Sequence, residues 1–155
     1  IYIARVPTKR IMTVTISVGT RFPAYATSMG RVLLAAQPDE RLDSYLDSVS
    51  LRGLTGHTIT NVTALRRELH KIRTQGWALV DQELEEGLRS IAAPSRDADT
   101  QVIAAINIST HAGRRTLSTI VEEFLQPLLS TARRIEVDLA RSRASARSAV
   151  ARPDA

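Results

Sequence analysis

The sequence predicts an α+β domain in which helices pack on one antiparallel sheet and a long helix closes the chain. Two observations predict this class. Alternation of apolar and polar residues, which is typical of strands, occurs at the start of the chain and again in its second half, on either side of helical patterns. The segments between the later strands are short, and short connections favour antiparallel pairing.

The first half of the chain predicts a β-hairpin followed by three helices. β-branched and aromatic residues favour the two strands of the hairpin. Thr27 or Ser28 can cap the first helix, and the third is capped by Asn61 or Thr63 and ended by Gly76. The predicted elements are strands at 1–6 and 11–18, a helix from about 27 to 37, a helix from 38, and a helix from about 61 to 76.

The second half predicts three strands and a final helix. The last of these strands is almost continuously apolar, so we expect it at the centre of the sheet. Apolar residues then recur at helical spacing, and Pro127 within this run should kink the helix or separate two helices. The predicted elements are strands at 77–81, 87–93 and 101–109, turns at 82–86 and 94–99, and a helix from about 116 to 140.

The composition is that of one ordinary globular domain. The chain has 155 residues, 43% of them apolar and 24% charged, and it lacks cysteine, which excludes disulfides and thiolate metal sites. No signal peptide or membrane-spanning pattern is visible, so we expect a cytoplasmic protein. The chain opens at Ile1 in strand-like sequence, which suggests a piece of a longer protein. Within it we expect a folded domain at 1–140 and a basic, flexible tail at 141–155.

The net charge of +5 is a weak sign of nucleic-acid binding. Four arginines lie in the last fifteen residues against a single acid, so the rest of the chain is nearly neutral. Aromatic side chains, on which bases could stack, make up only 4% of the sequence. We therefore favour a mixed, solvated surface with a basic tail over a nucleic-acid groove in this part of the protein.

The sequence offers little support for catalysis. Ser28 could act as a nucleophile, but Arg31 stands where an SxxK hydrolase has its lysine, and arginine cannot serve as a base. The acids Asp81, Glu83, Glu85 and Glu86 fill a predicted turn and are expected to be solvated. Three histidines lack metal-ligand spacing and are expected at the surface: His57, His70 and His111. We expect neither an enzyme nor a metal or other cofactor.

A small-molecule site is better supported. Ser90, Asn107 and Ser109 are polar positions in otherwise apolar strands, and the last two share one face because strands have a period of two. Each could simply bond neighbouring backbone. The predicted helix start at Ser28, with Gly30 in its first turn, offers free N–H groups that favour an anion. Together these features suggest that the strands and the helix start converge on a polar ligand.

The same stretch carries a family resemblance. The segment VGTRFPAYATSMGRVLLA, residues 18–35, resembles the effector-binding domain of IclR-family bacterial transcription regulators. The resemblance extends in order over about residues 1–140. It includes IARV at 3–6, GWAL at 76–79, DQE at 81–83, GLRSIAAP at 87–94 and AAINIS at 104–109.

This resemblance implies a GAF/PAS-like fold, with a winged helix-turn-helix DNA-binding domain in the N-terminal part that the sequence lacks. It implies a domain that senses a small carboxylate and biases DNA binding by a dimer or tetramer. A family acidic contact maps nearest to Asp81, although equal spacing from Ser90 lands on Val80. The effector-binding positions implied are Ser28, Met29, Gly30, Asp81, Ser90, Asn107 and Ser109. An apolar, pocket-lining patch maps to Ile11, Val14, Phe22 and Leu88.

Two segments, residues 18–35 and LVDQELEEGLRSIAAP at 79–94, most resemble one branch of the IclR family. This branch regulates aromatic catabolism through the β-ketoadipate pathway. That branch implies protocatechuate, 4-hydroxybenzoate or β-ketoadipate as the effector. Two alternatives stay open. The domain could be an oligomerisation module without a ligand, since its last helix has a long apolar stripe, or a serine-dependent hydrolase that uses Ser28.

Overall fold

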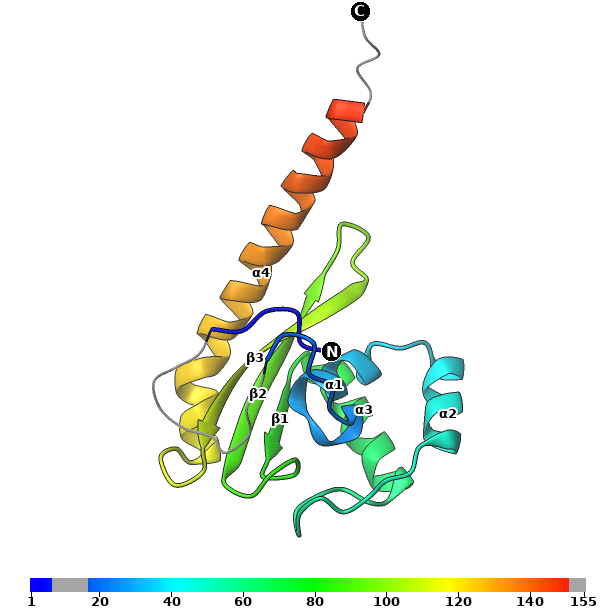
Figure 1. The fold of residues 1–155 in the computed structure, drawn as a ribbon, viewed down its shortest axis with the longest axis vertical. Coiled ribbons are helices and arrows are strands. Elements are labelled where there is room, and N and C mark those ends of the chain that lie inside the picture. The colour runs from blue at the N-terminus through cyan, green and yellow to red at the C-terminus, as the bar shows by residue number, and fades with distance from the viewer. Residues whose placement is uncertain (7–16, 151–155) are drawn as a thin grey trace, which may run out of the picture.

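The structure is a computed structural model that describes residues 1–6 and 17–150, with side chains up to residue 143. A three-stranded antiparallel sheet in the order β1-β2-β3 lies between two layers of helices (Figure 1). The elements are a 3-10 turn η1 (Ala24–Ala26), α1 (Ser28–Ala35), α2 (Asp39–Ser48), α3 (Val62–Gln75), β1 (Ala78–Asp81), β2 (Leu88–Arg96), β3 (Val102–His111) and α4 (Leu117–Val150). This arrangement confirms the predicted α+β class and the long C-terminal helix.

The two helical layers enclose separate cores. On one face of the sheet, Ala92 of β2 packs with the apolar faces of α1, α2 and α3. On the other face, Ile91 and Ala93 pack against Ile120 and Leu128 of α4. Neighbouring residues of β2 pack into different cores, because successive side chains of a strand point to opposite faces of the sheet. Burial of both faces explains why the sequence of this strand is so uniformly apolar.

The start of α1 is fixed by its cap and by a close backbone contact. Thr27 Oγ1 accepts a hydrogen bond from the Gly30 N–H at 3.1 Å, as the sequence predicts. A Cβ on Gly30 would come within 2.3 Å of the Ala24 carbonyl oxygen and 2.5 Å of the Ala24 Cα. The group that comes close to this glycine is therefore the η1 turn. The third helix also begins and ends as predicted, at the Asn61 cap and at Gly76.

The predicted N-terminal hairpin is only partly visible. Residues 1–6 do not form a regular strand, although two main-chain hydrogen bonds tie Tyr2 to Gly19 and Thr20 at 2.8 and 3.0 Å. Most of the second predicted strand lies outside the described residues. Its last residues, Ser17 and Val18, enter a turn that the Thr20 N–H closes on the Ser17 carbonyl, so the strand prediction was wrong there.

The later strands differ from the prediction in length and order. β2 runs through Pro94 to Arg96, where a turn was predicted. Within the described residues, β1 begins opposite Ala92, so Pro94 has a strand neighbour only in β3. Proline has no N–H to donate, and it is tolerated where one side of a strand has no neighbour. β2 rather than β3 is the central strand of the described sheet, because β2 pairs with both others.

The C-terminal helix is longer than predicted. α4 contains Pro127 as one continuous element and extends to Val150, ten residues past the predicted end (Figure 1). Of the two outcomes predicted for Pro127, a kink or a separation into two helices, the separation is therefore wrong. The C-terminal half of α4 is held by the end of β2 and the turn that follows it. Glu136 Oε1 accepts the Arg96 N–H at 2.7 Å, and Arg143 Nη1 lies 3.7 Å from Asp97 Oδ2. Neither α4 nor any other helix in the described part of the chain is apolar enough over its length to cross a membrane.

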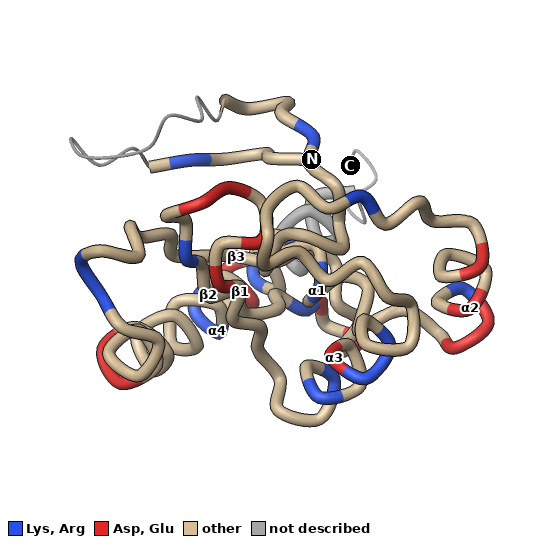
Figure 2. The backbone as a smooth tube through the Cα atoms, turned by 90° about the horizontal axis from the view of Figure 1, so that it is seen from below, with Lys and Arg blue, Asp and Glu red and all other residues tan. Residues whose placement is uncertain are grey.

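Charges of both signs are distributed around the molecule (Figure 2). Acidic side chains of α2 meet basic ones of α3 in two exposed ion pairs, Asp43 with Arg66 and Asp39 with Arg73. Each pair neutralises part of the positive charge of α3. This mixture favours the solvated surface over a basic groove for nucleic acid.

Candidate functional site

Polar residues form a row across the α1 side of the sheet. In the antiparallel register, Ser90 of β2 lies opposite Val80 of β1 on one side and opposite Ser109 of β3 on the other. Asn107 lies opposite Ala92, one step along the same face. The register therefore brings together the three polar strand residues that the sequence singled out.

The N-terminal end of α1 faces this row and closes it into a cleft. The empty space in the cleft is about 360 Å³, including the part open to solvent, and its interior has room for about one water molecule. Its lining residues are Tyr2, Ala26, Thr27, Ser28, Met29, Val80, Leu84, Leu88, Ser90, Asn107 and Ser109. None of these side chains is charged, so the polarity of the cleft comes from hydroxyl, amide and main-chain groups.

Some main-chain N–H groups in the first turn of α1 have no hydrogen-bond acceptor among the described residues. The Gly30 N–H is bound by Thr27 Oγ1, and the Arg31 N–H by the Thr27 carbonyl at 2.9 Å. The N–H groups of Ser28 and Met29 have no acceptor among the described residues. Free N–H groups in the first turn of a helix favour an anion, because they point outward at the positive end of the helix dipole.

The hydroxyls of two largely buried serines add to this capacity. Ser28 is 1% exposed and Ser90 is 8% exposed, and neither hydroxyl has a hydrogen-bond partner among the described residues. On β3, Asn107 Nδ2 donates to Ser109 Oγ at 2.9 Å, which leaves the Asn107 carbonyl oxygen and the Ser109 proton for another group. The cleft therefore offers donors and acceptors that suit a small anion with further polar groups.

Most of the predicted site residues meet at this cleft. Six of them line it: Ser28, Met29, Leu88, Ser90, Asn107 and Ser109. Gly30 does not, because its N–H is used by the cap and its bare Cα packs on η1. Phe22 lies just behind the lining, with its ring edge-on to that of Tyr2. Ile11 and Val14 lie outside the described residues.

Asp81 points away from the cleft, and Val80 takes the lining position. The Asp81 carboxylate is 2.6 Å from Arg89 Nε, and Arg89 also donates to the carbonyls of Ala112 and Arg115. The hydrogen bond from Arg89 holds the pKa of Asp81 below its usual range. Within this structure the carboxylate therefore ties β1 and β2 to the segment before α4, and the alternative mapping to Val80 fits the register.

Sequence reasoning missed a buried ion pair beside the cleft. Glu83 was expected to be solvated in its turn, but it is buried and binds the guanidinium of Arg31, which is 1% exposed. It also accepts the Ile59 N–H at 2.8 Å. The signal available in the sequence was Arg31 itself, since an arginine on the apolar face of a helix needs a buried counter-charge. Tyr2 and Leu84 were also missed as lining residues.

The geometry gives no support to catalysis or metal binding. All three histidines are exposed, and His111 Nδ1 only accepts the Gly113 N–H. None of the lining side chains could act as a base for Ser28. Among the residues with described positions, no group of three or more His, Asp or Glu could hold a metal ion. A sheet with helices on both faces and a neutral, polar-lined cleft defines a small-molecule-binding domain.

Comparisons with known proteins agree with this class. Residues 1–137 match the family model described as bacterial transcriptional regulator IclR C-terminal. The chain is 50% identical over 134 residues to the Pca regulon regulatory protein of Pseudomonas putida, covering 86% of this chain and 46% of that protein. The chain belongs to the IclR family of bacterial transcriptional regulators, as the C-terminal domain, and the family and these relatives are regulators rather than enzymes.

Solved structures support the same assignment. A Rhodococcus sp. RHA1 protein assigned as a transcriptional regulator is 51% identical, with a TM-score of 0.85 over 88% of this chain and 54% of that chain. The inducer-binding domain of PobR from Acinetobacter, a double mutant in complex with 3-hydroxybenzoic acid, is 31% identical. Its TM-score is 0.74, over 77% of this chain and 70% of that chain. The chain spans about half the length of the curated relatives it matches.

Proposed function

We propose that the cleft binds the carboxylate of a small aromatic or keto acid and that binding changes DNA binding by the full-length regulator. One observation carries the proposal: the free N–H groups of Ser28 and Met29 share a cleft with the hydroxyl of Ser90, which has no hydrogen-bond partner among the described residues. A carboxylate has enough lone pairs to accept from all three donors. The adjoining Val80, Leu84 and Leu88 offer an apolar wall that suits a ring or a short carbon chain.

The relatives narrow the class of effector. One is a Pca regulon regulator, another is the p-hydroxybenzoate hydroxylase transcriptional activator of Acinetobacter baylyi, and the PobR domain was solved with a hydroxybenzoic acid. Protocatechuate, 4-hydroxybenzoate and β-ketoadipate are the effectors we favour, in a regulator of aromatic catabolism. Because the cleft has room for about one water molecule, entry of any of these acids requires the lining side chains to move.

The rest of the regulator is inferred from the family. The chain spans 46% of its Pseudomonas putida relative and corresponds to the C-terminal part. We infer a winged helix-turn-helix domain N-terminal to it, a homodimer or homotetramer, and action in the cytoplasm, where the DNA lies. The division into a sensor domain at 1–140 and a basic tail at 141–155 stays a prediction.

Thermal denaturation with a panel of acids tests the proposal. At a hundred times its dissociation constant, a ligand stabilises the fold by about 2.7 kcal/mol, which raises the midpoint by several degrees. We expect this shift with an aromatic or keto acid, and a smaller one in Ser90→Ala. Ser44→Ala, on the exposed face of α2, is the matched control and should respond like the wild type. A chain that oligomerises but responds to none of the acids would favour the oligomerisation module instead.

A further inference from the structure

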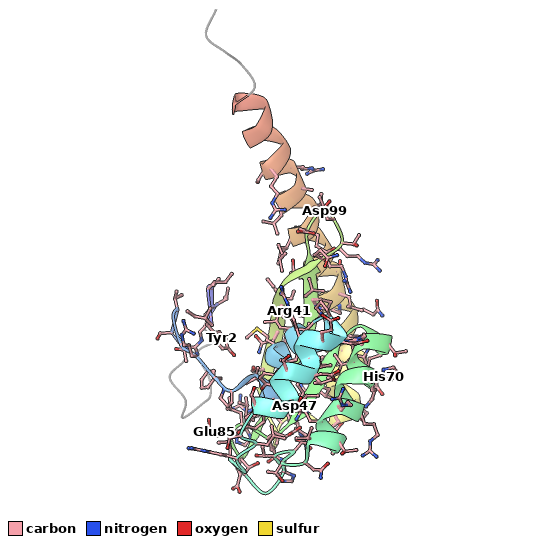
Figure 3. All side chains as sticks on the ribbon, turned by 90° about the vertical axis from the view of Figure 1, so that its right-hand side faces the viewer. Tyr2, Arg41, Asp47, His70, Glu85 and Asp99 are labelled. Carbon is pink, nitrogen blue, oxygen red and sulfur yellow. The ribbon has the colours of Figure 1, made fainter. Side chains whose placement is uncertain are left out.

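Tyr2 is the lining residue that neither the sheet nor α1 supplies. It belongs to the N-terminal segment, which stands apart from the helices in Figure 3. Its side chain is half-buried in the cleft, and its hydroxyl has no hydrogen-bond partner among the described residues. The neutral phenol is therefore available to a group that enters the cleft.

Three contacts fix the position of this residue. The Tyr2 N–H donates to the Thr20 carbonyl at 3.0 Å, and the Tyr2 carbonyl accepts the Gly19 N–H at 2.8 Å. The ring meets the Phe22 ring edge-on, with centroids 5.8 Å apart and an angle of 83° between the planes. The backbone and ring are thus held before any ligand binds, which lowers the entropic cost of using the hydroxyl.

The phenol is suited to donate rather than to ionise. Burial raises the pKa of Tyr2 above its ordinary value, against a smaller opposing effect of the Arg5 cation. The hydroxyl therefore keeps its proton at neutral pH. Since the Ser28 and Met29 amides come from α1 and Tyr2 comes from a different segment, the two sets of donors can serve different oxygens of one ligand.

We infer that Tyr2 is a specificity-determining residue of this cleft, whose hydroxyl donates to a second oxygen of the effector, separate from the carboxylate bound at α1. This inference rests on the proposed function. The ligand class it selects is a carboxylic acid that carries a further hydroxyl, keto or carboxylate oxygen. A plain monocarboxylic acid would leave the phenol unpaired and would bind more weakly.

Isothermal titration calorimetry on the 155-residue chain and its Tyr2→Phe variant tests the inference. The variant keeps the ring and its contact with Phe22 and loses only the hydroxyl. Tyr45→Phe, which removes a phenol on α2 outside the cleft, is the matched control. The ligands are benzoate, which has a single carboxylate, 4-hydroxybenzoate, adipate and β-ketoadipate. Adipate has a second carboxylate, and β-ketoadipate has a second carboxylate and a keto group. Comparison of their affinities therefore shows whether the hydroxyl of Tyr2 binds the keto oxygen or the second carboxylate.

We expect Tyr2→Phe to weaken the best-binding oxygenated acid by about threefold to tenfold, which is the effect of one neutral hydrogen bond, and to leave benzoate unchanged. Unchanged affinity for that acid in Tyr2→Phe would overturn the inference and leave the proposed function standing. An equal loss for benzoate would do the same, since it would show packing or carboxylate binding instead. Failure of the wild-type chain to bind any of the acids would overturn both.

Discussion

Arg31 of α1 binds Glu83 of the β1–β2 turn through two hydrogen bonds, from Nη1 to Oε1 at 2.7 Å and from Nη2 to Oε2 at 2.5 Å. Arg31 Nε also donates to the Tyr25 carbonyl at 2.7 Å. The pair joins the two walls of the cleft, because Ser28 and Met29 begin the same helix and Leu84 follows Glu83 in the turn. Both side chains are almost wholly shielded from solvent.

Breaking this pair from one side should destabilise the domain strongly. Removal of one partner leaves a buried, unpaired charge, so Arg31→Met or Glu83→Leu should each lower the free energy of unfolding by about 3–5 kcal/mol. The double variant should recover much of this loss, since both charges are then gone. Urea denaturation of the four proteins measures the coupling. Additive losses in the double variant would show that the two side chains act independently.

Asp81→Asn separates a structural from a ligand-binding role for this carboxylate. Asp81 is bound to Arg89 on the face opposite the cleft, so we expect effector affinity to stay at the wild-type value. Stability should fall at neutral pH because the charged pair is lost. Calorimetric titration and denaturation of the same preparation measure both properties. A large loss of affinity with unchanged stability would place Asp81 in the effector site after all.

The pH dependence of this variant has a defined sign. The folded-state pKa of Asp81 is lowered by Arg89, so its contribution to stability is complete above the unfolded pKa, which is about 3.9. The contribution is lost as the pH falls through the lower, folded pKa. The stability difference between the wild type and Asp81→Asn should therefore be constant from pH 7 to 5 and shrink below pH 4. A difference that grew on acidification would contradict this assignment.

Gly30→Ala should disturb both the fold and the cleft. The added methyl group would lie 2.3 Å from the Ala24 carbonyl oxygen and 2.6 Å from Thr27 Oγ1, so η1 or the helix cap must move. We expect a loss of about 1–3 kcal/mol in stability, as for other overpacked sites. Gly53→Ala is the control, since its nearest neighbour would be a side-chain carbon 3.6 Å away. Equal melting temperatures for the two variants would rule out this clash.

The sequence predicted which strand residues share a face better than it predicted the order of the strands. Period-two spacing placed Asn107 and Ser109 on one face correctly, because that spacing is a property of any strand. Within the described sheet the choice of β3 as the central strand was wrong, because a continuous apolar run does not report the number of neighbours a strand has. Glu83 and Tyr2 were missed for a related reason. Arg31 lies 52 residues from Glu83 in the sequence, and the residues that line the cleft with Tyr2 come from α1 and from the sheet. A single sequence does not record such contacts.

Asn107 and Ser109 provide the last prediction. Their side chains share a hydrogen bond of 2.9 Å, which leaves the Ser109 proton and the Asn107 carbonyl oxygen free to bind another group, and both residues line the cleft. Each alanine variant should weaken effector binding by roughly tenfold, the effect of about 1.4 kcal/mol. In the double variant, affinity should fall by less than the product of the two single losses. Either single substitution already removes the hydrogen bond that holds the other side chain in place. Calorimetric affinities of the four proteins complete the cycle. Fully multiplicative losses would mean that the two residues bind the effector separately, and wild-type affinity in both single variants would remove β3 from the site.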